Sequence, residues 1–186
     1  MANTVLVLSR IAADNVDAYN RSAICSEDVM NGTVVTLESG FSETAGKEFV
    51  WTATPLGDVG KHAQYWMACA PEVNVLADGT LLYKGISVDP RNCTNVKNVE
   101  FDVFSLQIGD CVQISTPFFA SAQDPATIGD TAKFVEYTAG TGWKAIAEAT
   151  SAYTGLRFAI RKAMPFAIGT DRLHNWIAEI KYKKKD

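Results

Sequence analysis

The sequence predicts a mainly β protein, namely an antiparallel sandwich or barrel of short strands with one or two short helices. Three observations support this fold class. Turn signals built from Gly, Asn and Asp are frequent, the segments between them have strand composition, and several of these segments alternate apolar with polar residues. The pattern indicates roughly ten short strands, a number typical of sandwiches and barrels.

Two stretches begin with the same turn signal and continue as predicted strands. Residues 31–37 read NGTVVTL and residues 78–84 read DGTLLYK. Asn-Gly and Asp-Gly favour tight turns, and the β-branched or bulky residues after them favour an extended backbone. We therefore expect a turn followed by a strand at both places.

Alternation is clearest around position 100, where Val99, Phe101 and Val103 are separated by Glu100 and Asp102. Successive side chains of a strand point to opposite faces, so this segment predicts a strand with one face exposed to water. Three further segments follow the same pattern, the last of them less cleanly: Leu156, Phe158 and Ile160 against Arg157 and Arg161; Trp176, Ala178, Ile180 and Tyr182 against Glu179 and Lys181; and Phe49 and Trp51, then Tyr65, Met67 and Cys69.

The tripeptide Ile-Gly-Asp occurs twice, at residues 108–110 and 128–130, and each copy precedes apolar alternation. Gly adopts backbone angles that other residues avoid, and Asp bonds its own backbone in turns, so both copies are interpreted as the start of a strand. The competing interpretation is a pair of carboxylates, Asp110 and Asp130, acting as general acid and base. The turn interpretation is preferred because it explains the glycine in both copies.

Two segments, residues 11–21 and 143–152, do not fit the strand pattern and are the candidate short helices. The length favours a single β-rich domain over residues 1–182. Residues 1–30, polar and weakly patterned, are a candidate partner-contacting arm. Residues 183–186 form a basic, solvated tail that discourages pairing at a strand edge.

Composition narrows the class of protein. Apolar residues make up 47% and charged residues 20% of the 186 residues, as in ordinary globular domains. The net charge of −4 repels phosphate, so we expect no nucleic-acid partner. No apolar run reaches the length of a membrane span or a signal-peptide core, so we expect no membrane partner and a protein made in the cytosol, where Cys25, Cys69, Cys93 and Cys111 stay reduced.

Motifs that carry chemistry are missing from the chain. It contains no Gly-x-Gly-x-x-Gly, no Gly-Lys-Ser/Thr phosphate loop and no Gly-x-Ser-x-Gly elbow. His62 and His174 have no ligand at metal-binding spacing, and no calcium-loop pattern organises the early acidic residues Asp14, Asp17, Glu27 and Asp28. We therefore expect no enzyme and assign no catalytic, cofactor-binding or metal-binding residue, and no cofactor.

Four tryptophans are the remaining candidates for a binding surface: Trp51, Trp66, Trp143 and Trp176. Exposed aromatic rings anchor protein interfaces and stack on sugars, whereas tryptophan in an alternating strand is more often part of the core. Core positions are favoured. If any of them binds, a protein partner is preferred over a glycan, and a carbohydrate-binding β-sandwich that acts in host or surface attachment is the alternative function.

Five stretches together resemble a family of tailed-bacteriophage virion proteins encoded beside the major capsid protein and generally regarded as head decoration proteins. They read NTVLVLSRIAADNVDAYNRSA, NGTVVTL, APEVNVL, GISVDPRNCTN and FDVFSLQIGD, and the resemblance extends to about residue 115. These are signatures of turns and strands rather than of chemistry. The resemblance leaves three subclasses open: a cement protein, a head-fibre base or another minor virion component.

The resemblance implies a non-enzymatic structural protein that decorates and stabilises a bacteriophage capsid. It implies the major capsid protein as the partner, a homo-oligomer with a trimer favoured, and a location on the capsid exterior after synthesis in the host bacterial cytoplasm. On this view the candidate arm, residues 1–30, is the segment that contacts the capsid lattice.

Overall fold

A computed structural model describes residues 20–41, 50–56, 64–69, 73–75, 81–83, 94–138, 141–153, 155–164, 166–168 and 171–182. Its contacts divide the chain into two compact units. Unit 1 contains the described residues up to Ser105, and unit 2 contains those from Leu106 onward. Each unit is described by itself, and the single domain over residues 1–182 stays a prediction.

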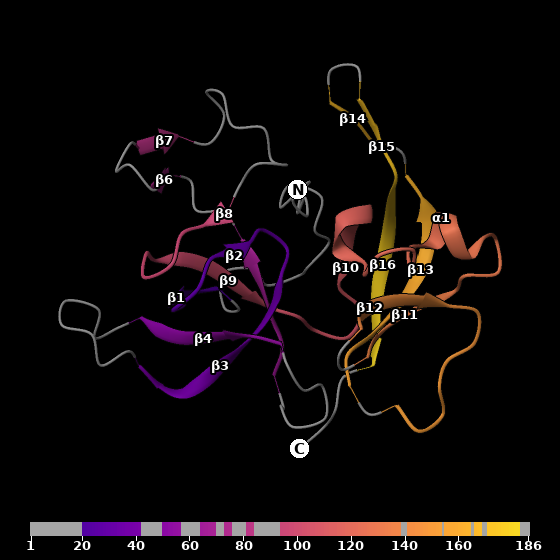
Figure 1. Ribbon diagram of the computed structural model, residues 1–186. Helices are drawn as coiled ribbons and strands as arrows, with labels where there is room; N and C mark the ends of the chain where they lie inside the picture. Colours follow the sequence, from indigo (N-terminus) through magenta and orange to yellow (C-terminus); the bar gives the residue numbers. More distant parts are fainter. Residues whose placement is uncertain are drawn as a thin grey trace. The chain divides into compact units, whose positions relative to one another are not determined.

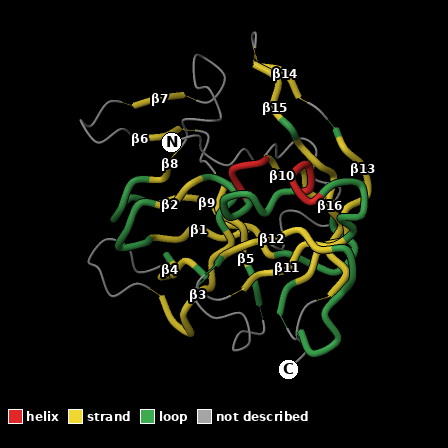
Figure 2. Tube along the Cα trace, turned by 45° about the vertical axis from the view of Figure 1, so that its right-hand side comes forward, coloured by secondary structure: helices red, strands yellow, loops and turns green. Residues whose placement is uncertain are grey.

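The predicted fold class is confirmed, because the protein is mainly β with a barrel, a half-barrel and one lone α-helix in the described part. In Figure 2 strands, drawn in yellow, run through both units, and the red helical segments are short. The strands of unit 1 are β1 (Asn20–Ile24), β2 (Val29–Met30), β3 (Val34–Phe41), β4 (Trp51–Pro55), β5 (Trp66–Cys69), β6 (Val73–Val75), β7 (Leu81–Tyr83), β8 (Thr94–Asn95) and β9 (Phe101–Ser105).

Five strands of unit 1 close into a barrel in the order β1-β4-β3-β5-β9 (Figure 1). β1 runs parallel to β4 and antiparallel to β9, and the other neighbours are antiparallel. The predicted alternation near position 100 is confirmed in β9, where Phe101 and Val103 are buried and Asp102 is exposed. The barrel core consists of Ala23, Cys25, Val29, Val35, Ala53, Trp66, Ala68, Phe101 and Val103, with Leu37 packed against it.

The predicted Asn-Gly turn is confirmed between β2 and β3, where Gly32 has a φ of 85°. The strand predicted after the Asp-Gly signal is also confirmed, because it is β7, which pairs with β6. Its turn, residues 78–79, lies outside the described residues. Positive φ is accessible to glycine without strain, which explains why the sequence carries glycine before β3.

The candidate arm, residues 1–30, falls partly within the described part of the chain. Residues 20–30 include β1, which pairs on both sides within the barrel, and β2, which pairs with β8. Residues 1–19 lie outside the described residues, and so does most of the first candidate helix, residues 11–21. The contact between this segment and a capsid stays a prediction.

Unit 2 is built on a five-stranded antiparallel sheet in the order β10-β16-β13-β11-β12. Its strands are β10 (Cys111–Ser115), β11 (Phe134–Thr138), β12 (Gly142–Ile146), β13 (Arg157–Ala163) and β16 (Asn175–Tyr182). The predicted alternation is confirmed in β16, where Trp176, Ala178 and Ile180 are buried and Lys181 is exposed. In Figure 1 the hairpin of β14 (Phe166–Ile168) and β15 (Asp171–Leu173) continues β13 and β16 beyond the sheet.

Aromatic rings fill the core on one face of this sheet. Phe118 stacks on Trp143 with ring centroids 5.1 Å apart and meets Phe158 edge-on at 5.9 Å. Trp143 meets Phe158 at 5.4 Å, and Phe119 meets Trp176 at 5.6 Å, both near-perpendicular. Offset and edge-on arrangements are the favourable geometries for aromatic pairs, so these contacts stabilise the unit beyond simple burial.

The helix expected over residues 143–152 is wrong. Its first four residues belong to β12, where Trp143 and Ala145 face the core, and residues 147–152 form turns and loop. Trp143, Ile146 and Ala147 have the spacing of a helix face, whereas Trp143 and Ala145 have the spacing of a strand face, and pairing with β11 decides for the strand.

The helical segments occur at prolines that the sequence analysis did not use. The 3-10 helix η4 (Thr116–Phe118) and the helix α1 (Pro125–Ile128) both have proline in the first turn, where its fixed φ suits a helix and its missing N–H is not needed. Asp124 caps α1 by accepting hydrogen bonds from the N–H groups of Ala126 and Thr127.

The first Ile-Gly-Asp copy starts a strand as predicted. Gly109, with φ of 98°, lies in the turn before β10, and its N–H donates to the carbonyl of Ile180. The prediction is wrong for the second copy, because Gly129, with φ of 90°, ends α1 and β11 begins only at Phe134. The shared feature is a left-handed glycine, which serves equally at a strand turn and at a helix end.

Replacing Gly109 by alanine is expected to lower the free energy of unfolding by about 1–2 kcal/mol. A Cβ atom at this position meets no atom within 4 Å, so the penalty arises from the positive φ alone. Urea unfolding of both proteins measures the difference. Gly109→Asn is the control and should lose less, since asparagine tolerates positive φ; an equal loss for both variants would contradict this explanation.

Candidate functional site

An exposed cluster of one arginine and two aromatic residues lies on unit 1, and we call Arg21, Phe41 and Trp51 the Trp51 surface. Arg21 lies on β1, Trp51 on the neighbouring strand β4, and Phe41 at the end of β3 opposite Trp51. Arg21 is exposed, Trp51 is half-buried, and Phe41 is 51% exposed. An exposed group of large side chains of this kind is typical of a contact surface.

The Trp51 surface is ordered by cation–π and ring contacts. The Arg21 guanidinium lies 4.3 Å from the centroid of the Trp51 ring and 5.1 Å from that of Trp66. The Phe41 and Trp51 rings are 4.9 Å apart and tilted by 53°. Each arginine–indole contact stabilises by about 0.5–2 kcal/mol, so the side chains of Arg21 and Trp51 hold one another in place before any partner arrives.

Strand alternation explains why Arg21 reaches these rings. Arg21 is two residues from Ala23, which belongs to the barrel core, so both side chains leave β1 on the same side. Trp66 is part of that core and only 3% exposed. Arg21 therefore lies over the outer part of the core, with its guanidinium against the Trp51 and Trp66 rings.

The preference for tryptophan as core is confirmed at Trp66, Trp143 and Trp176, which are buried. Trp51 is the exception and the one partly exposed tryptophan among the four. The sequence carried a weak signal for it, because Phe49 and Trp51 matched the alternating pattern less cleanly than the other strands did. The pairing of Arg21 with Trp51 could not be read from the sequence, since the closing of a barrel brings them together.

A second candidate site is a hollow of about 390 Å³ in unit 2, between α1 with the turn that follows it and the strands β13 and β16. Asp130, Arg161, Lys162, His174 and Trp176 line it, together with small and apolar residues. Two candidates from the sequence, Asp130 and His174, thus lie in one hollow although no pairing between them was predicted.

Asp110 is not part of this hollow. Its carboxylate accepts a hydrogen bond of 2.9 Å from the N–H of Gln107, and its carbonyl accepts one from the N–H of Ile180. Ile180 is four residues from Trp176 on β16, which is about 13 Å along a strand. The structure therefore separates Asp110 from Asp130 and gives Asp110 the turn role that was preferred for it.

The other residues weighed as metal ligands are only partly described. His62, Asp14 and Asp17 lie outside the described residues. Asp28 accepts a hydrogen bond of 2.8 Å from the N–H of Lys97, a role within the loops of unit 1. Within the described ranges, no three His, Cys, Asp or Glu side chains come together as metal ligands would.

Three of the four cysteines are described, and they are thiols rather than disulfides. Cys25 and Cys69 are buried and Cys111 is half-buried. Burial raises the pKa of the Cys25 thiol, and burial followed by the nearby Glu179 carboxylate raises the pKa of the Cys111 thiol. Since the thiolate is the reactive form, Cys25 and Cys111 are weak nucleophiles at neutral pH.

Glu179 is the centre of a small charged group on β16. Hydrogen bonds from Lys181 and then Arg161 lower the pKa of its carboxyl group, and both side chains form ion pairs with it. A lowered pKa means that these contacts favour the folded state above the unfolded pKa and lose that effect as the pH falls through the folded one. Arg161 is therefore held toward Glu179 at neutral pH.

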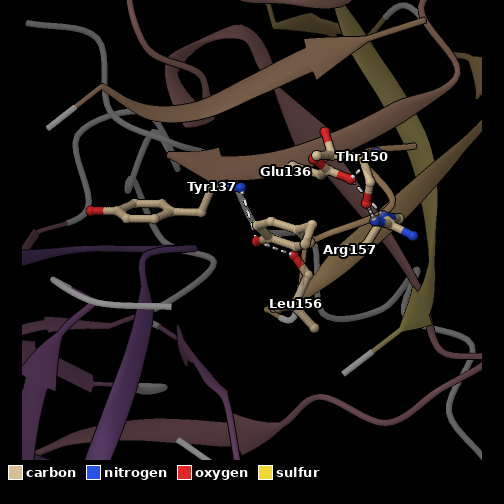
Figure 3. Close-up of polar contacts among 6 residues, drawn as sticks. Glu136, Tyr137, Thr150, Leu156 and Arg157 are labelled. Atoms are coloured by element: carbon tan, nitrogen blue, oxygen red, sulfur yellow. Dashed lines mark hydrogen bonds and ion pairs between the residues drawn. The ribbon is translucent and has the colours of Figure 1, made fainter. Parts of the chain in front are cut away.

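A buried ion pair in unit 2 anchors the loop between β12 and β13 (Figure 3). The Arg157 Nε donates a 2.7 Å hydrogen bond to the Glu136 carboxylate, which also accepts one of 3.1 Å from the N–H of Thr150. The Arg157 guanidinium donates a second bond, of 2.6 Å, to the Thr150 carbonyl. Glu136 and Arg157 are cross-strand partners on β11 and β13. These contacts connect β11, β13 and the loop between β12 and β13, which indicates a structural role.

Tyr153 closes the same loop a few residues further on. Its hydroxyl donates a 2.8 Å hydrogen bond to the Leu156 carbonyl and accepts one of 3.1 Å from the N–H of Tyr137 (Figure 3). The sequence analysis missed both networks because no local pattern connects residues on different strands.

Comparison with protein families, curated proteins and solved structures found no match for this chain. The described residues also include no helix with the length and apolarity needed to cross a lipid bilayer.

Proposed function

We propose that this chain is a non-enzymatic structural protein of a tailed-bacteriophage virion, which binds the outside of the assembled capsid and stabilises it. The resemblance of five stretches to head decoration proteins motivates the proposal, and the Trp51 surface carries it. The proposed partner is the major capsid protein, the location is the capsid exterior, and the proposed assembly is a homo-oligomer, with a trimer favoured by the resemblance alone.

The Trp51 surface has the composition of a protein-binding hot spot. Tryptophan and arginine are among the residues that contribute most to protein interfaces, where a few anchors supply most of the binding energy. Arg21 and Trp51 are already in contact in the isolated chain, so little conformational entropy is lost when a partner covers them. Phe41 offers a half-exposed ring beside them that a partner can cover.

Binding to a repeating lattice at several points raises the overall affinity above that of one contact. A protein that binds the folded shell, but not its dissociated subunits, stabilises the shell by mass action. If the chains associate into a trimer, each further contact becomes intramolecular, and the avidity exceeds the affinity of one surface. A single Trp51 surface per chain is therefore sufficient for firm attachment.

Replacing Phe41 by alanine is expected to weaken binding to capsids of the cognate phage by about tenfold or more, because a hot-spot side chain contributes 1.4 kcal/mol or more. The fold should be unaffected, since half of this ring is exposed. Trp51→Ala should weaken binding further. Co-sedimentation of each purified variant with capsids, over a range of protein concentrations, measures the effect.

Ile108→Ala is the matched control, because Ile108 is an equally exposed apolar residue, at 53%, but belongs to unit 2. It should bind capsids as the original chain does. Saturable binding of the original chain with no loss in Phe41→Ala and Trp51→Ala would reject the Trp51 surface as the contact. No binding of the original chain at all would reject the proposed function.

A further inference from the structure

The hollow in unit 2 has the size of a small-ligand site. Its volume of about 390 Å³ lies within the usual range of ligand pockets, roughly 300–1,000 Å³. Small residues, Ala126, Gly129, Ala132 and Ala163, keep it open, and a Cβ atom added at Gly129 would meet nothing within 4 Å. The hollow therefore exists because its lining side chains are small and because α1 ends at Gly129.

Side chains of opposite charge line this hollow. Asp130, from the turn after α1, supplies a carboxylate, and Lys162, from β13, supplies an ammonium group. Neither forms an ion pair with another described residue, and both are exposed. Arg161 also lines the hollow, but its guanidinium is paired with Glu179. Lys162 and Asp130 are thus the charged groups available to a ligand.

A β-bulge in β13 places the basic residues. Ile160 pairs with Ala178 and Lys162 with Ile177, so Arg161 is the extra residue opposite one step of β16. Bulges redirect side chains and are frequent beside binding sites. Arg161 and Lys162 at the bulge and Ala163 after it are all exposed at the end of β13, so both basic side chains are open to solvent beside the hollow.

An aromatic wall completes the hollow. The rings of His174 and Trp176 lie nearly parallel, at 21°, with centroids 6.4 Å apart, and both residues line the space. His174 is exposed, whereas Trp176 is buried. Aromatic walls of this kind receive the apolar face of a ring-shaped ligand, while polar groups at the rim fix its orientation.

We propose that this hollow binds one acidic sugar residue of the hexuronic acid class. Its carboxylate meets the Lys162 ammonium group, its hydroxyl groups donate to the Asp130 carboxylate, and its apolar ring face lies against the exposed His174 ring, which the buried Trp176 ring supports. A phosphate group would be attracted by the Lys162 ammonium group but repelled by the Asp130 carboxylate, and it has no hydroxyl-bearing ring to offset that repulsion. A neutral sugar would leave Lys162 without an acceptor. The site belongs to unit 2 and does not depend on the Trp51 surface, so it adds an activity to the proposed capsid binding.

Nuclear magnetic resonance titration of the full chain tests this site with four probes: D-glucuronate, D-glucose, acetate and inorganic phosphate. Glucuronate is expected to shift the amide signals of residues 129–132 and 160–163 in a saturable way, with a dissociation constant that is roughly millimolar for a ligand of this size. Glucose, acetate and phosphate should each bind about tenfold more weakly or worse, because each lacks at least one of the matched groups.

Two variants and a control assign the contacts. Lys162→Gln and Asp130→Asn should each weaken glucuronate binding about tenfold, whereas Lys133→Gln, an exposed lysine outside the lining, should leave it unchanged. Acetate binding as tightly as glucuronate would overturn the sugar part of the proposal, and equal binding of glucose would overturn the acidic part. Tighter binding of phosphate would overturn the proposed ligand class, and the absence of shifts at these residues would overturn the site.

Discussion

Replacing Glu136 by alanine is expected to lower the free energy of unfolding by about 3 kcal/mol. The Glu136 side chain is 3% exposed and accepts hydrogen bonds from Arg157 and from the N–H of Thr150. Its removal leaves a largely buried guanidinium without its carboxylate and an N–H group without its acceptor. Urea unfolding at neutral pH measures the change, together with the loss of order in residues 147–153.

A double-mutant cycle separates the ion pair from the loss of packing. Arg157→Ala alone should also destabilise, but the pair Glu136→Ala and Arg157→Ala should lose less than the sum of the two single changes, since neither charge then remains unpaired. Glu148→Ala, at an exposed glutamate in the same loop, is the control and should change stability by no more than about 0.5 kcal/mol. Additive losses would show that the two side chains act independently.

Replacing Phe158 by alanine is expected to be the most damaging single change in unit 2, at about 3–5 kcal/mol. Phe158 is fully buried on β13, and its ring meets Phe118 and Trp143 edge-on. Truncation removes these contacts and leaves a cavity that a rigid sheet cannot close. Thermal unfolding followed by near-ultraviolet circular dichroism, which reports the packing of Trp143, measures the loss.

Phe41→Ala provides the matched comparison, because it is the same substitution on a strand of unit 1 but at a half-exposed ring. It should shift the unfolding transition little and, on the proposed function, should weaken capsid binding. If Phe158→Ala proved as mild as Phe41→Ala, the aromatic core described for unit 2 would be wrong.

The strands were predictable where one face is buried and the other is wet. β9 and β16 were recognisable because apolar and charged residues alternate along them, and that alternation follows from the geometry of a single strand. The helix expected at residues 143–152 failed for the opposite reason. Trp143, Ile146 and Ala147 have helical spacing while Trp143 and Ala145 have strand spacing, and the hairpin pairing with β11 decides the outcome.

The candidate sites were predictable only in part. Asp130, His174 and the tryptophans drew attention by residue type, but what surrounds them depends on strand order. Arg21 reaches Trp51 because a barrel closes, and Arg161 and Lys162 lie at a bulge near the exposed end of β13. Neither event leaves a signal within a window of neighbouring residues, so the residue pairs that define both sites were missed.

The edge of the unit 2 sheet at β12 is covered by its own chain. The N–H of Ala120 donates to the carbonyl of Trp143, and the N–H of Ala145 donates to the carbonyl of Gln123. An open edge strand offers its backbone groups to any other extended chain and so invites aggregation. The carbonyl of Trp143 and the N–H of Ala145 are therefore already hydrogen-bonded within the chain when many copies are crowded together. Growth of an intermolecular sheet from this edge would first require residues 120–123 to be displaced, so the β12 edge is protected against pairing with another copy.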